Sequence, residues 1–409
     1  MMLSGHIVPA WRNLLRNRRR TLVTVGAVAF TMALLVLVGA LSEGMVQGLI
    51  RNVTETSMGL VQAHAPGYLS DPSFYTAMEH SEVLEAAAKD AGISVARRSF
   101  GGGLLAYGDK SAGARIWGVV PEMEKAFRFS GSLAEGTFLS AKTPPGSVVL
   151  GRKIAHLLKA GIGDDIVVLV QASDGSVGNE LLRVVGVFAP IGDDFDRSAA
   201  VISSADFEHV FVSGGRVHEL AFLARDGRSA ETLVSELEPF AEGAVLRTWR
   251  QLMPPISDMD LMMRGMMVFV GLVFSLAAGF GIVNTMMMAV HERVREYGVL
   301  KALGCTPLRL FVDTSIEALL MGGVGTVLGG LVGQGLVVWF IYHPIDLSRI
   351  VGDMSLVGVA FDPLWRAASA PDLIFLNAVV MLVLCWGVSI LPALRAARLN
   401  PVEAMNHDG

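Results

Sequence analysis

The sequence contains few of the residues on which disulfide-stapled proteins and cytosolic enzymes depend. Only two of its 409 residues are cysteines, Cys305 and Cys385, which excludes a framework of several disulfides and a zinc site built from cysteines. Charged residues make up 17% of the chain and aromatic residues 7%, whereas hydrophobic residues reach 52%. This composition lies outside the soluble globular average and argues against an ordinary cytosolic enzyme.

Several motifs that carry chemistry are also missing. The sequence has no GxxxxGK[ST] phosphate loop, so the chain is not expected to hydrolyse ATP by that mechanism, and it has no GxSxG nucleophile elbow. Its histidines lack metal-site spacing, so we predict no catalytic residue and no metal ligand. The glycine cluster at 101–103 is not followed by a lysine, which indicates a bulge or a tight turn. The net charge of −5 argues against a nucleic-acid partner.

Long apolar runs are abundant by contrast. A helix needs about 20 mostly apolar residues to cross the hydrocarbon core of a bilayer. Four runs meet this length, and they predict transmembrane helices at 22–42, 265–290, 313–342 and 373–394. The runs are continuously apolar and lack the alternation of a membrane barrel, so helices are the expected spanning form. The fold class predicted is a membrane protein with one span, a large inserted domain and three further spans.

The distribution of Lys and Arg predicts the orientation, because cytoplasmic flanks of spans are enriched in these residues. Basic side chains gather before the first span, between the second and third, and after the fourth: Arg12, Arg16, Arg18, Arg19, Arg20, Arg293, Arg295, Lys301, Arg309, Arg395 and Arg398. We therefore expect a cytoplasmic amphipathic basic segment at 1–21, a cytoplasmic loop at 291–312 and a cytoplasmic tail at 395–409. The loop at 343–372 is expected outside. A cleaved signal peptide is the alternative for the N-terminus, but its apolar run exceeds the usual length and lacks an A-x-A site.

Residues 43–264 are then expected to form an extracytoplasmic domain of mixed α and β structure. Apolar segments bounded by turn residues predict strands at 147–150, 166–171, 181–188 and 219–224. Helical patterns occur at 81–91 and at 229–241, where Ser229 can cap the helix. The domain holds 28 acidic residues against 20 basic residues. Although the net charge of the whole chain is negative, the segments expected in the cytoplasm are therefore basic.

The loop after the second span carries the most informative pattern. Residues 291–304 predict a short amphipathic helix that Gly304 ends and that Pro307 prevents from continuing. One interpretation is a charged flank that anchors two spans at the membrane interface. The other is a lever that docks into the groove of a partner protein.

At these residues the sequence resembles the FtsX-like permeases of ABC transporters, which include the MacB, LolC and LolE branches. The family pattern E-R-x-R-E-[IY]-G-x-L-[RK]-A-L-G-x-[ST] is matched from Glu292 to Thr306. The segments 10–20 and 392–404 agree with the family too, as do 149–155 and 118–121 within the expected external domain. The resemblance therefore spans the whole chain and includes the arrangement of one span before the domain and three after it.

The resemblance implies a transporter subunit that pairs with a second copy or a paralogue and couples to a separate pair of ABC ATPase subunits. The chain itself would then bind no cofactor, and ATP and Mg²⁺ would belong to the ATPase. The residues that it assigns to ATPase coupling are Glu292, Arg293, Arg295, Glu296, Tyr297, Gly298, Leu300, Lys301 and Gly304.

Length and span number resemble the LolC and LolE branch, which implies release of lipoproteins from the inner membrane and a possible periplasmic chaperone as partner. The hairpin expected at 171–181 is short and lacks proline, unlike the longer hook of LolC. MacB-like export of another amphipathic substrate and FtsX-like regulation of a cell-wall hydrolase remain alternatives. A secondary transporter would need a polar site at the membrane midplane, which the sequence does not suggest.

Two features of the spans predict further sites. Gly325, Gly329 and Gly333 recur every four residues and predict close packing of the third span against another helix. Methionines cluster where the external domain meets the second span, and an adaptable apolar side chain of this kind suits acyl chains. Ordinary packing is the alternative for these methionines. The candidate residues of a lipid or substrate cavity are Met259, Met262, Met263, Met266, Met267 and Phe30.

Overall fold

The computed structural model describes residues 10, 12, 14, 16, 18–347, 355–356, 359–360 and 364–399. The chain divides into two units. We call the first unit the bundle, which comprises Met1–Gln47, Asp260–Asp346 and Leu364–Gly409, and the second the core domain, which comprises Gly48–Met259 and Leu347–Pro363. The expected segments 1–21, 343–372 and 395–409 lie partly outside the described residues.

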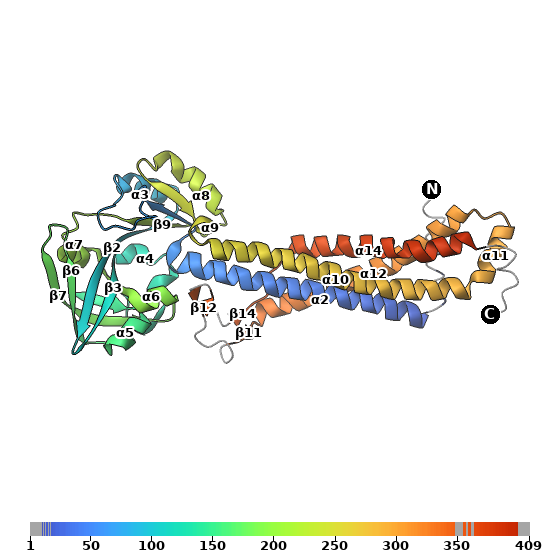
Figure 1. Ribbon diagram of the computed structural model, residues 1–409, viewed down its shortest axis with the longest axis horizontal. Coiled ribbons are helices and arrows are strands. Elements are labelled where there is room, and N and C mark those ends of the chain that lie inside the picture. Colours follow the sequence, from blue (N-terminus) through green and yellow to red (C-terminus); the bar gives the residue numbers. More distant parts are fainter. Residues whose placement is uncertain are drawn as a thin grey trace. The chain divides into compact units, whose positions relative to one another are not determined.

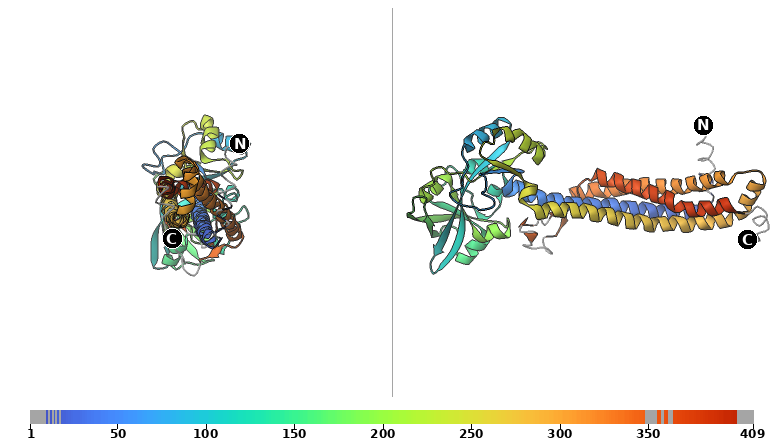
Figure 2. Two further views of the ribbon diagram at one scale, coloured as in Figure 1. Left: turned by 90° about the vertical axis from the view of Figure 1, so that its right-hand side faces the viewer. Right: turned by 45° about the horizontal axis from the view of Figure 1, so that its top comes forward.

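Long helices form the bundle and run side by side (Figures 1 and 2). They are α2 (Arg18–Val53), α10 (Pro254–Glu292), α12 (Pro307–Tyr342) and α14 (Pro371–Arg398), joined by the short α11 (Val294–Ala302) between α10 and α12. Within the part of the chain that the structure describes, four helices are long and apolar enough to cross a membrane. The expected arrangement of one span, a mixed α/β domain and three spans is therefore confirmed.

All four helices are longer than the apolar runs that predicted them, and the difference is largest for α2 and α10. Helix α2 continues past residue 42 to Val53 and then widens into the π-helix η1 (Thr54–Met58), and α10 begins at Pro254 rather than at 265. A hydropathy run ends at the first charged residue, but a helix ends only where a breaker intervenes. Gly59 is such a breaker, with a φ of 77°.

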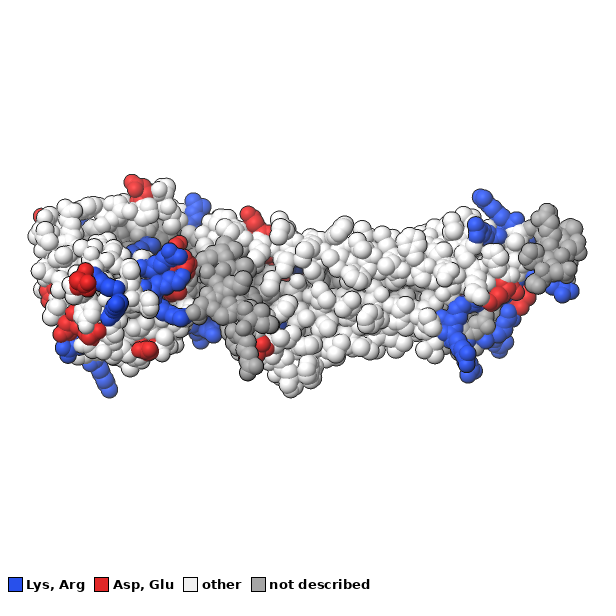
Figure 3. Space-filling view, turned by 60° about the horizontal axis from the view of Figure 1, so that its bottom comes forward, with Lys and Arg blue, Asp and Glu red and all other residues white. Residues whose placement is uncertain are grey.

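Packing of uncharged side chains, rather than ion pairing, holds the middle of the bundle together. Met286, Met321, Met381 and Cys385 are buried in its interior. Figure 3 shows Lys and Arg gathered at one end of the bundle and an uncharged surface over its middle. Uncharged side chains are the ones that a hydrocarbon environment accepts without cost.

The predicted glycine stripe lies where α12 packs against α2. A Cβ atom placed on Gly325 would lie 2.7 Å from Cβ of Val28, and one on Gly329 would lie 2.2 Å from the carbonyl oxygen of Ala29. At Gly333 the corresponding atom would lie 2.8 Å from Cβ of Val36. The backbones of the two helices approach one another as closely as they do because no side chain separates them.

The core domain is built on a ten-stranded sheet with the order β10-β1-β9-β2-β3-β8-β5-β7-β4, in which β6 pairs with β2 and β7. Its strands are β1 (Val61–His64), β2 (Ser94–Tyr107), β3 (Lys110–Val119), β4 (Leu133–Gly136), β5 (Ser147–Leu150), β6 (Asp165–Gln171), β7 (Val177–Phe188), β8 (Ala199–Ser203), β9 (Glu219–Leu223) and β10 (Val245–Thr248). Two short pairs lie outside this sheet, β11 (Ile345–Asp346) with β14 (Leu364–Trp365) and β12 (Ser355–Leu356) with β13 (Val359–Ala360).

Short helices complete the core domain. They are α3 (Ser81–Asp90), α4 (Pro121–Glu124), α5 (Arg152–Leu158), α6 (Asp193–Ser198), α7 (Ser204–Phe211), α8 (Ala230–Leu237) and α9 (Trp249–Leu252), with 3-10 turns η2 (Arg128–Gly131) and η3 (Glu238–Phe240). The predicted strands correspond to β5, β6, β7 and β9, and the predicted helices to α3 and α8.

The glycine cluster at 101–103 is not the bulge or turn that the sequence suggested. Its residues lie in regular antiparallel register within β2, opposite Ile116, Arg115 and Ala114 of β3. A Cβ atom on Gly101 would lie 2.3 Å from the ring of Phe211, and one on Gly103 would lie 2.8 Å from Ile116. These glycines are therefore needed because aromatic and branched side chains pack directly on the strand backbone.

A buried arginine stands at the centre of the core domain. Arg98 on β2 is 1% exposed, and its guanidinium lies 2.7 and 2.8 Å from the two carboxylate oxygens of Glu124 and 2.8 Å from Glu219. It also donates to the carbonyl oxygen of Ser57, at the end of η1. The rings of Trp117, Phe127 and Phe129 surround it at 5.2 to 5.8 Å. Burial lowers the pKa of Arg98, but the two carboxylates outweigh this effect and raise it above its ordinary value.

Candidate functional site: the segment between α10 and α12

The segment between α10 and α12 folds as a short helix bounded by two breaks. Helix α10 ends at Glu292, and Arg293 leaves the helical conformation with φ and ψ of −111° and 12° before α11 begins at Val294. Gly304 has a φ of 91°, and Thr306 then caps α12 with its side chain. The helix predicted over 291–304 is thus α11, which is shorter because a break at Arg293 separates it from α10.

One side of α11 packs against the bundle. Tyr297 and Gly298 are buried, and Tyr297 lies in an apolar cluster with Val290, Leu310 and Ala396. Burial raises the pKa of the Tyr297 hydroxyl. The ammonium of Lys301 donates to the carbonyl oxygens of Ala397 at 2.6 Å and of Leu399 at 2.7 Å. A positive charge is stabilised by the carbonyl oxygens at the C-terminal end of a helix. Lys301 therefore links α11 to the end of α14.

Ion pairs join the same segment to α2. The guanidinium of Arg20 lies 3.1 Å from both carboxylate oxygens of Glu292, and Arg16 lies 2.9 Å from Glu296. Arg293 also donates to Glu296 at 2.9 Å. Burial raises the pKa of Glu296, but the hydrogen bonds from Arg293 and Arg16 outweigh it and hold the pKa below its usual value. Glu296 therefore stays ionised where it contacts α2.

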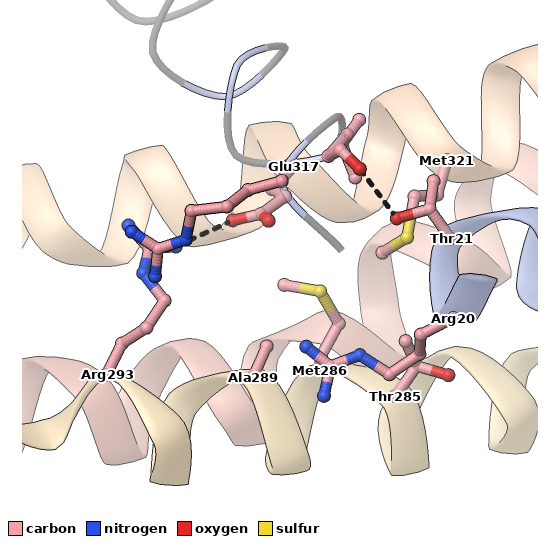
Figure 4. Close-up of a pocket in the computed structure, with 10 residues that line it drawn as sticks. Arg20, Thr21, Thr285, Met286, Ala289, Arg293, Glu317 and Met321 are labelled. Carbon is pink, nitrogen blue, oxygen red and sulfur yellow. Dashed lines mark hydrogen bonds and ion pairs between the residues drawn. The ribbon is translucent and has the colours of Figure 1, made fainter. Parts of the chain in front are cut away.

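A third contact reaches α12 through Glu317, which is buried. Arg293 lies 3.5 Å from its carboxylate and 5.1 Å from the centre of the Tyr297 ring. Figure 4 shows the two charged groups pointing toward one another across a small pocket that Arg16, Arg20, Thr285 and Met321 also line. The segment is thus tied to α2, α12 and α14 by different side chains.

The opposite side of the segment is exposed and apolar. Leu303 is 80% exposed and Leu308 is 71% exposed, and Val299 and Leu300 are also exposed beside Arg295. Exposed apolar side chains that lie close together mark sites of protein–protein or membrane interaction. The family pattern includes Leu303, but the residues assigned to ATPase coupling did not include Leu303 or Leu308. The signal for those two was available, because they are leucines on both sides of a glycine turn in a charged segment.

The structure does not bring the candidate residues of a lipid cavity together. Met262 and Met266 are exposed, and Met259 packs at the edge of the apolar cluster of the core domain. Helices α2 and α10 run antiparallel, with Thr24 at 2.7 Å from Thr285 and Glu43 at 3.0 Å from Arg264. Phe30 therefore lies about 20 Å along the helix axis from Met266 at 1.5 Å per residue. Met263 and Met267, which follow Met262 and Met266 in the sequence, are partly exposed.

A second charged cluster lies at the other end of the bundle, and no pattern in the sequence predicted it. Arg264 lies 3.0 Å from Glu43 of α2, 3.2 Å from Asp260 of α10 and 3.2 Å from Asp372 of α14. One cation therefore holds carboxylates from three helices. Among the residues that the structure describes, no group of three His, Cys, Asp or Glu side chains is arranged to hold a metal ion.

Comparison with known proteins gives two family matches that together cover most of the chain. Residues 21–240 match the MacB-like periplasmic core domain, and residues 268–401 match the FtsX-like permease C-terminal region. The first match alone covers more than half of the sequence.

Individual relatives are more distant. The lipoprotein-releasing system transmembrane protein LolC of Xylella fastidiosa is 25% identical over 74% of this chain and 75% of its own length. The macrolide export ATP-binding/permease protein MacB 1 of Yersinia pestis is 24% identical over 98% of this chain, which spans 60% of that relative's length. The periplasmic region of MacB from Actinobacillus actinomycetemcomitans matches 51% of this chain and 97% of its own, with 16% identity and a TM-score of 0.38. By its two family matches and its four spans, the chain belongs to the ABC transporter permeases of the LolC, MacB and FtsX type, with a MacB-like periplasmic core domain.

Proposed function

We propose that the chain is a permease subunit that takes up motion from a separate pair of ATPase subunits and passes it to its periplasmic core domain to release lipoproteins from the inner membrane. The observation that carries this proposal is the two-sided construction of the segment between α10 and α12. Its inner side is tied to three helices through Glu296, Lys301 and Arg293, and its outer side presents Leu303 and Leu308. A segment built in this way can receive a partner on one side and displace the bundle on the other.

The proposed orientation puts α11 and both termini in the cytoplasm and the core domain in the periplasm. The basic side chains flanking α2, α11 and the end of α14 support it, because short cytoplasmic flanks are enriched in Lys and Arg. In this orientation ATP and Mg²⁺ are bound by the ATPase, which the exposed face of α11 contacts. A second copy of the permease or a paralogue completes the complex.

Helix α2 supplies the route from the cytoplasmic side to the core domain. It is one continuous helix from Arg18 to Val53. Arg16 and Arg20 lie at its cytoplasmic end against Glu296 and Glu292, and its last turns belong to the core domain, where Leu49 and Val53 are part of the apolar core. An uninterrupted helix transmits a displacement along its axis because its hydrogen bonds resist extension.

The likeness to LolC supports lipoproteins as the cargo, since it extends over about three quarters of both chains. The likeness to MacB favours a second candidate, export of another amphipathic molecule, because it extends over 98% of this chain. Both cargoes use the same proposed transmission through α11 and α2. They are distinguished by measuring whether lipoproteins accumulate in the inner membrane when the chain is depleted.

Co-purification of the full-length permease with its candidate ABC ATPase tests the transmission. We expect Leu303→Asp together with Leu308→Asp to abolish association, because a desolvated apolar contact would receive two charges. Val177→Asp is the matched control, since Val177 is an exposed apolar residue of the core domain. Unchanged association of the double variant would reject α11 as the docking segment.

A further inference from the structure

An apolar groove lies between α2 and α12 at the end of the bundle that carries the arginines. Leu14, Arg18, Thr21, Leu22 and Val25 form one wall, and they recur at three- and four-residue intervals on one helix face. Leu320, Met321 and Val324 form the other wall. Among these lining residues Arg18 is the single charged one. The hydroxyl of Thr21 donates to the carbonyl oxygen of Leu14 at 3.0 Å, so this polar group is already satisfied within the protein.

The groove exists because the glycine contacts stop at Gly325. From Gly325 to Gly333 the backbone of α12 lies directly against α2, whereas the preceding turn of α12 carries Met321 and Val324. Larger side chains hold the two helices apart, and Leu22 remains exposed at the opening. The resulting groove is lined mostly by apolar side chains, which suits a hydrocarbon chain.

The opening of the groove is positively charged. Five arginines lie on α2 or just before it: Arg12, Arg16, Arg18, Arg19 and Arg20. Glu292 pairs with Arg20 and Glu296 pairs with Arg16, and Glu317 lies beside the same two arginines. The five arginines outnumber these three carboxylates. Figure 3 shows the basic side chains concentrated at this end of the bundle. A ligand that fits both features has an apolar tail and an anionic head.

We propose that the groove binds an anionic phospholipid, with one acyl chain between Val25 and Val324 and the phosphate near Arg18. Basic pockets between transmembrane helices at the membrane surface recognise anionic headgroups in this manner. In the proposed orientation the lipid comes from the cytoplasmic leaflet, so only the choice of leaflet rests on the proposed function. The groove lies at the end of the bundle opposite to Arg264.

Thermal unfolding of the delipidated full-length protein in detergent tests this binding without any ATPase. We expect phosphatidylglycerol to raise Tm with lipid concentration, and phosphatidylcholine to raise it less. Arg18→Gln should weaken the effect of phosphatidylglycerol about fivefold, as loss of one basic contact does. Arg295→Gln is the matched control, because Arg295 is exposed at the same end but does not line the groove.

A second variant tests the groove itself. Val324→Trp should fill the groove and abolish stabilisation by both lipids. Val332→Trp, on an exposed face of the same helix, should leave the stabilisation by both lipids unchanged. Equal stabilisation by the two lipids in the unmodified protein, or full stabilisation of Val324→Trp by phosphatidylglycerol, would overturn the proposal. Glycerol phosphate that stabilises as strongly as the lipid would also overturn it, since an anion alone would then suffice.

A second copy of the chain is the other occupant that an apolar groove could take. Cross-linking of Val324→Cys in a Cys305→Ser background distinguishes the two. Lipid binding predicts no cross-linked dimer through position 324 and protection of this cysteine from maleimide by phosphatidylglycerol. Efficient dimer formation through position 324 would show that protein fills the groove and would contradict the proposal.

Discussion

Arg98 in the core domain is buried with its charge intact, whereas the middle of the bundle is held by glycine contacts and contains no comparable charge among the described residues. In the core domain, Glu124 and Glu219 neutralise the arginine within the fold. In the bundle, Gly325, Gly329 and Gly333 bring two helices together, and the ion pairs of Arg16, Arg20, Arg264 and Arg293 lie toward its ends.

The difference follows from the solvent around each unit. A buried charge in a water-soluble domain can be stabilised by carboxylates and hydrogen bonds, although removal of one partner leaves the others uncompensated. Within a bilayer the free-energy cost of burying a charge is larger. Helices there are held together by close packing of their backbones instead of by buried ion pairs. The core domain should therefore be sensitive to loss of charge, and the bundle to added volume.

The largest effect is expected when Arg98 is replaced. Arg98→Met leaves Glu124 and Glu219 buried without their cation and should cost about 3–5 kcal/mol of folding free energy. Arg183→Met is the matched control, because the exposed pair of Arg183 with Asp165 should contribute at most about 1 kcal/mol. Chemical unfolding of the full-length protein in detergent, followed by the fluorescence of its tryptophans, measures both. An Arg98→Met variant as stable as the control would break the comparison.

Added volume should act on the bundle in the complementary way. Gly329→Leu places side-chain atoms where the carbonyl oxygen of Ala29 lies, and such overpacking should destabilise the bundle by about 1–3 kcal/mol. At the neighbouring Gly330 a Cβ atom would meet nothing within 4 Å, so Gly330→Leu is the control. Thermal unfolding in detergent distinguishes the two. If both leucine variants melt alike, the close contact of α2 and α12 does not hold the bundle together.

Much of this arrangement was readable from the sequence. Apolar length predicted the four spans, and apolar segments bounded by turn residues predicted β5, β6, β7 and β9. The hairpin of β2 and β3 was missed, because glycines at 101–103 are typical of turns and nothing local indicates that Phe211 packs on them. Arg98 was missed for a similar reason. A single arginine looks solvated in a sequence, and its partners Glu124 and Glu219 lie 26 and 121 residues away.

The candidate site shows the same limit. The family pattern pointed to Glu292 and Glu296, but their contacts with Arg20 and Arg16 join residues separated by 272 and 280 positions. Such pairing depends on how α2 packs against α10, and hydropathy fixes only which residues enter the membrane. The same applies to Arg264, whose three carboxylates come from three helices.

Arg264 tests the comparison of the two units from the other side, because it is a charged residue that links three helices of the bundle. Arg264→Gln should cost about 1–3 kcal/mol, since it leaves Glu43, which is mostly buried, near Asp260 and Asp372. The cost should be smaller than that of Arg98→Met because Arg264 and Asp372 are partly solvated. Arg250→Gln, which removes an exposed arginine 4.0 Å from Glu231, is the control. Unfolding in detergent measures the difference, and a loss as large as that of Arg98→Met would mean that the bundle depends on charge as the core domain does.

The smallest effect concerns the pH dependence of the core domain. Nδ1 of His218 accepts a hydrogen bond from the backbone N–H of Phe100 at 3.0 Å, and Nε2 lies 2.8 Å from the carbonyl oxygen of Phe74. These two contacts together require the neutral ring protonated at Nε2. Burial lowers the pKa of His218, and the charges of Arg115 and Arg216 and the neighbouring His64 lower it further.

Because the folded-state pKa lies below the unfolded one, the unfolded chain takes up this proton first as the pH falls. Stability contributed by neutral His218 is therefore present above the ordinary pKa of histidine, about 6.5, and is lost below it. The loss should not exceed about 1.4 kcal/mol per pH unit for one proton. Unfolding at pH 7.5 and pH 5.5 measures it, and His218→Gln should reduce the slope relative to His209→Gln, an exposed histidine of the same domain. Equal slopes in the two variants would mean that another group titrates, and that the core domain is sensitive to charge at Arg98 but not at His218.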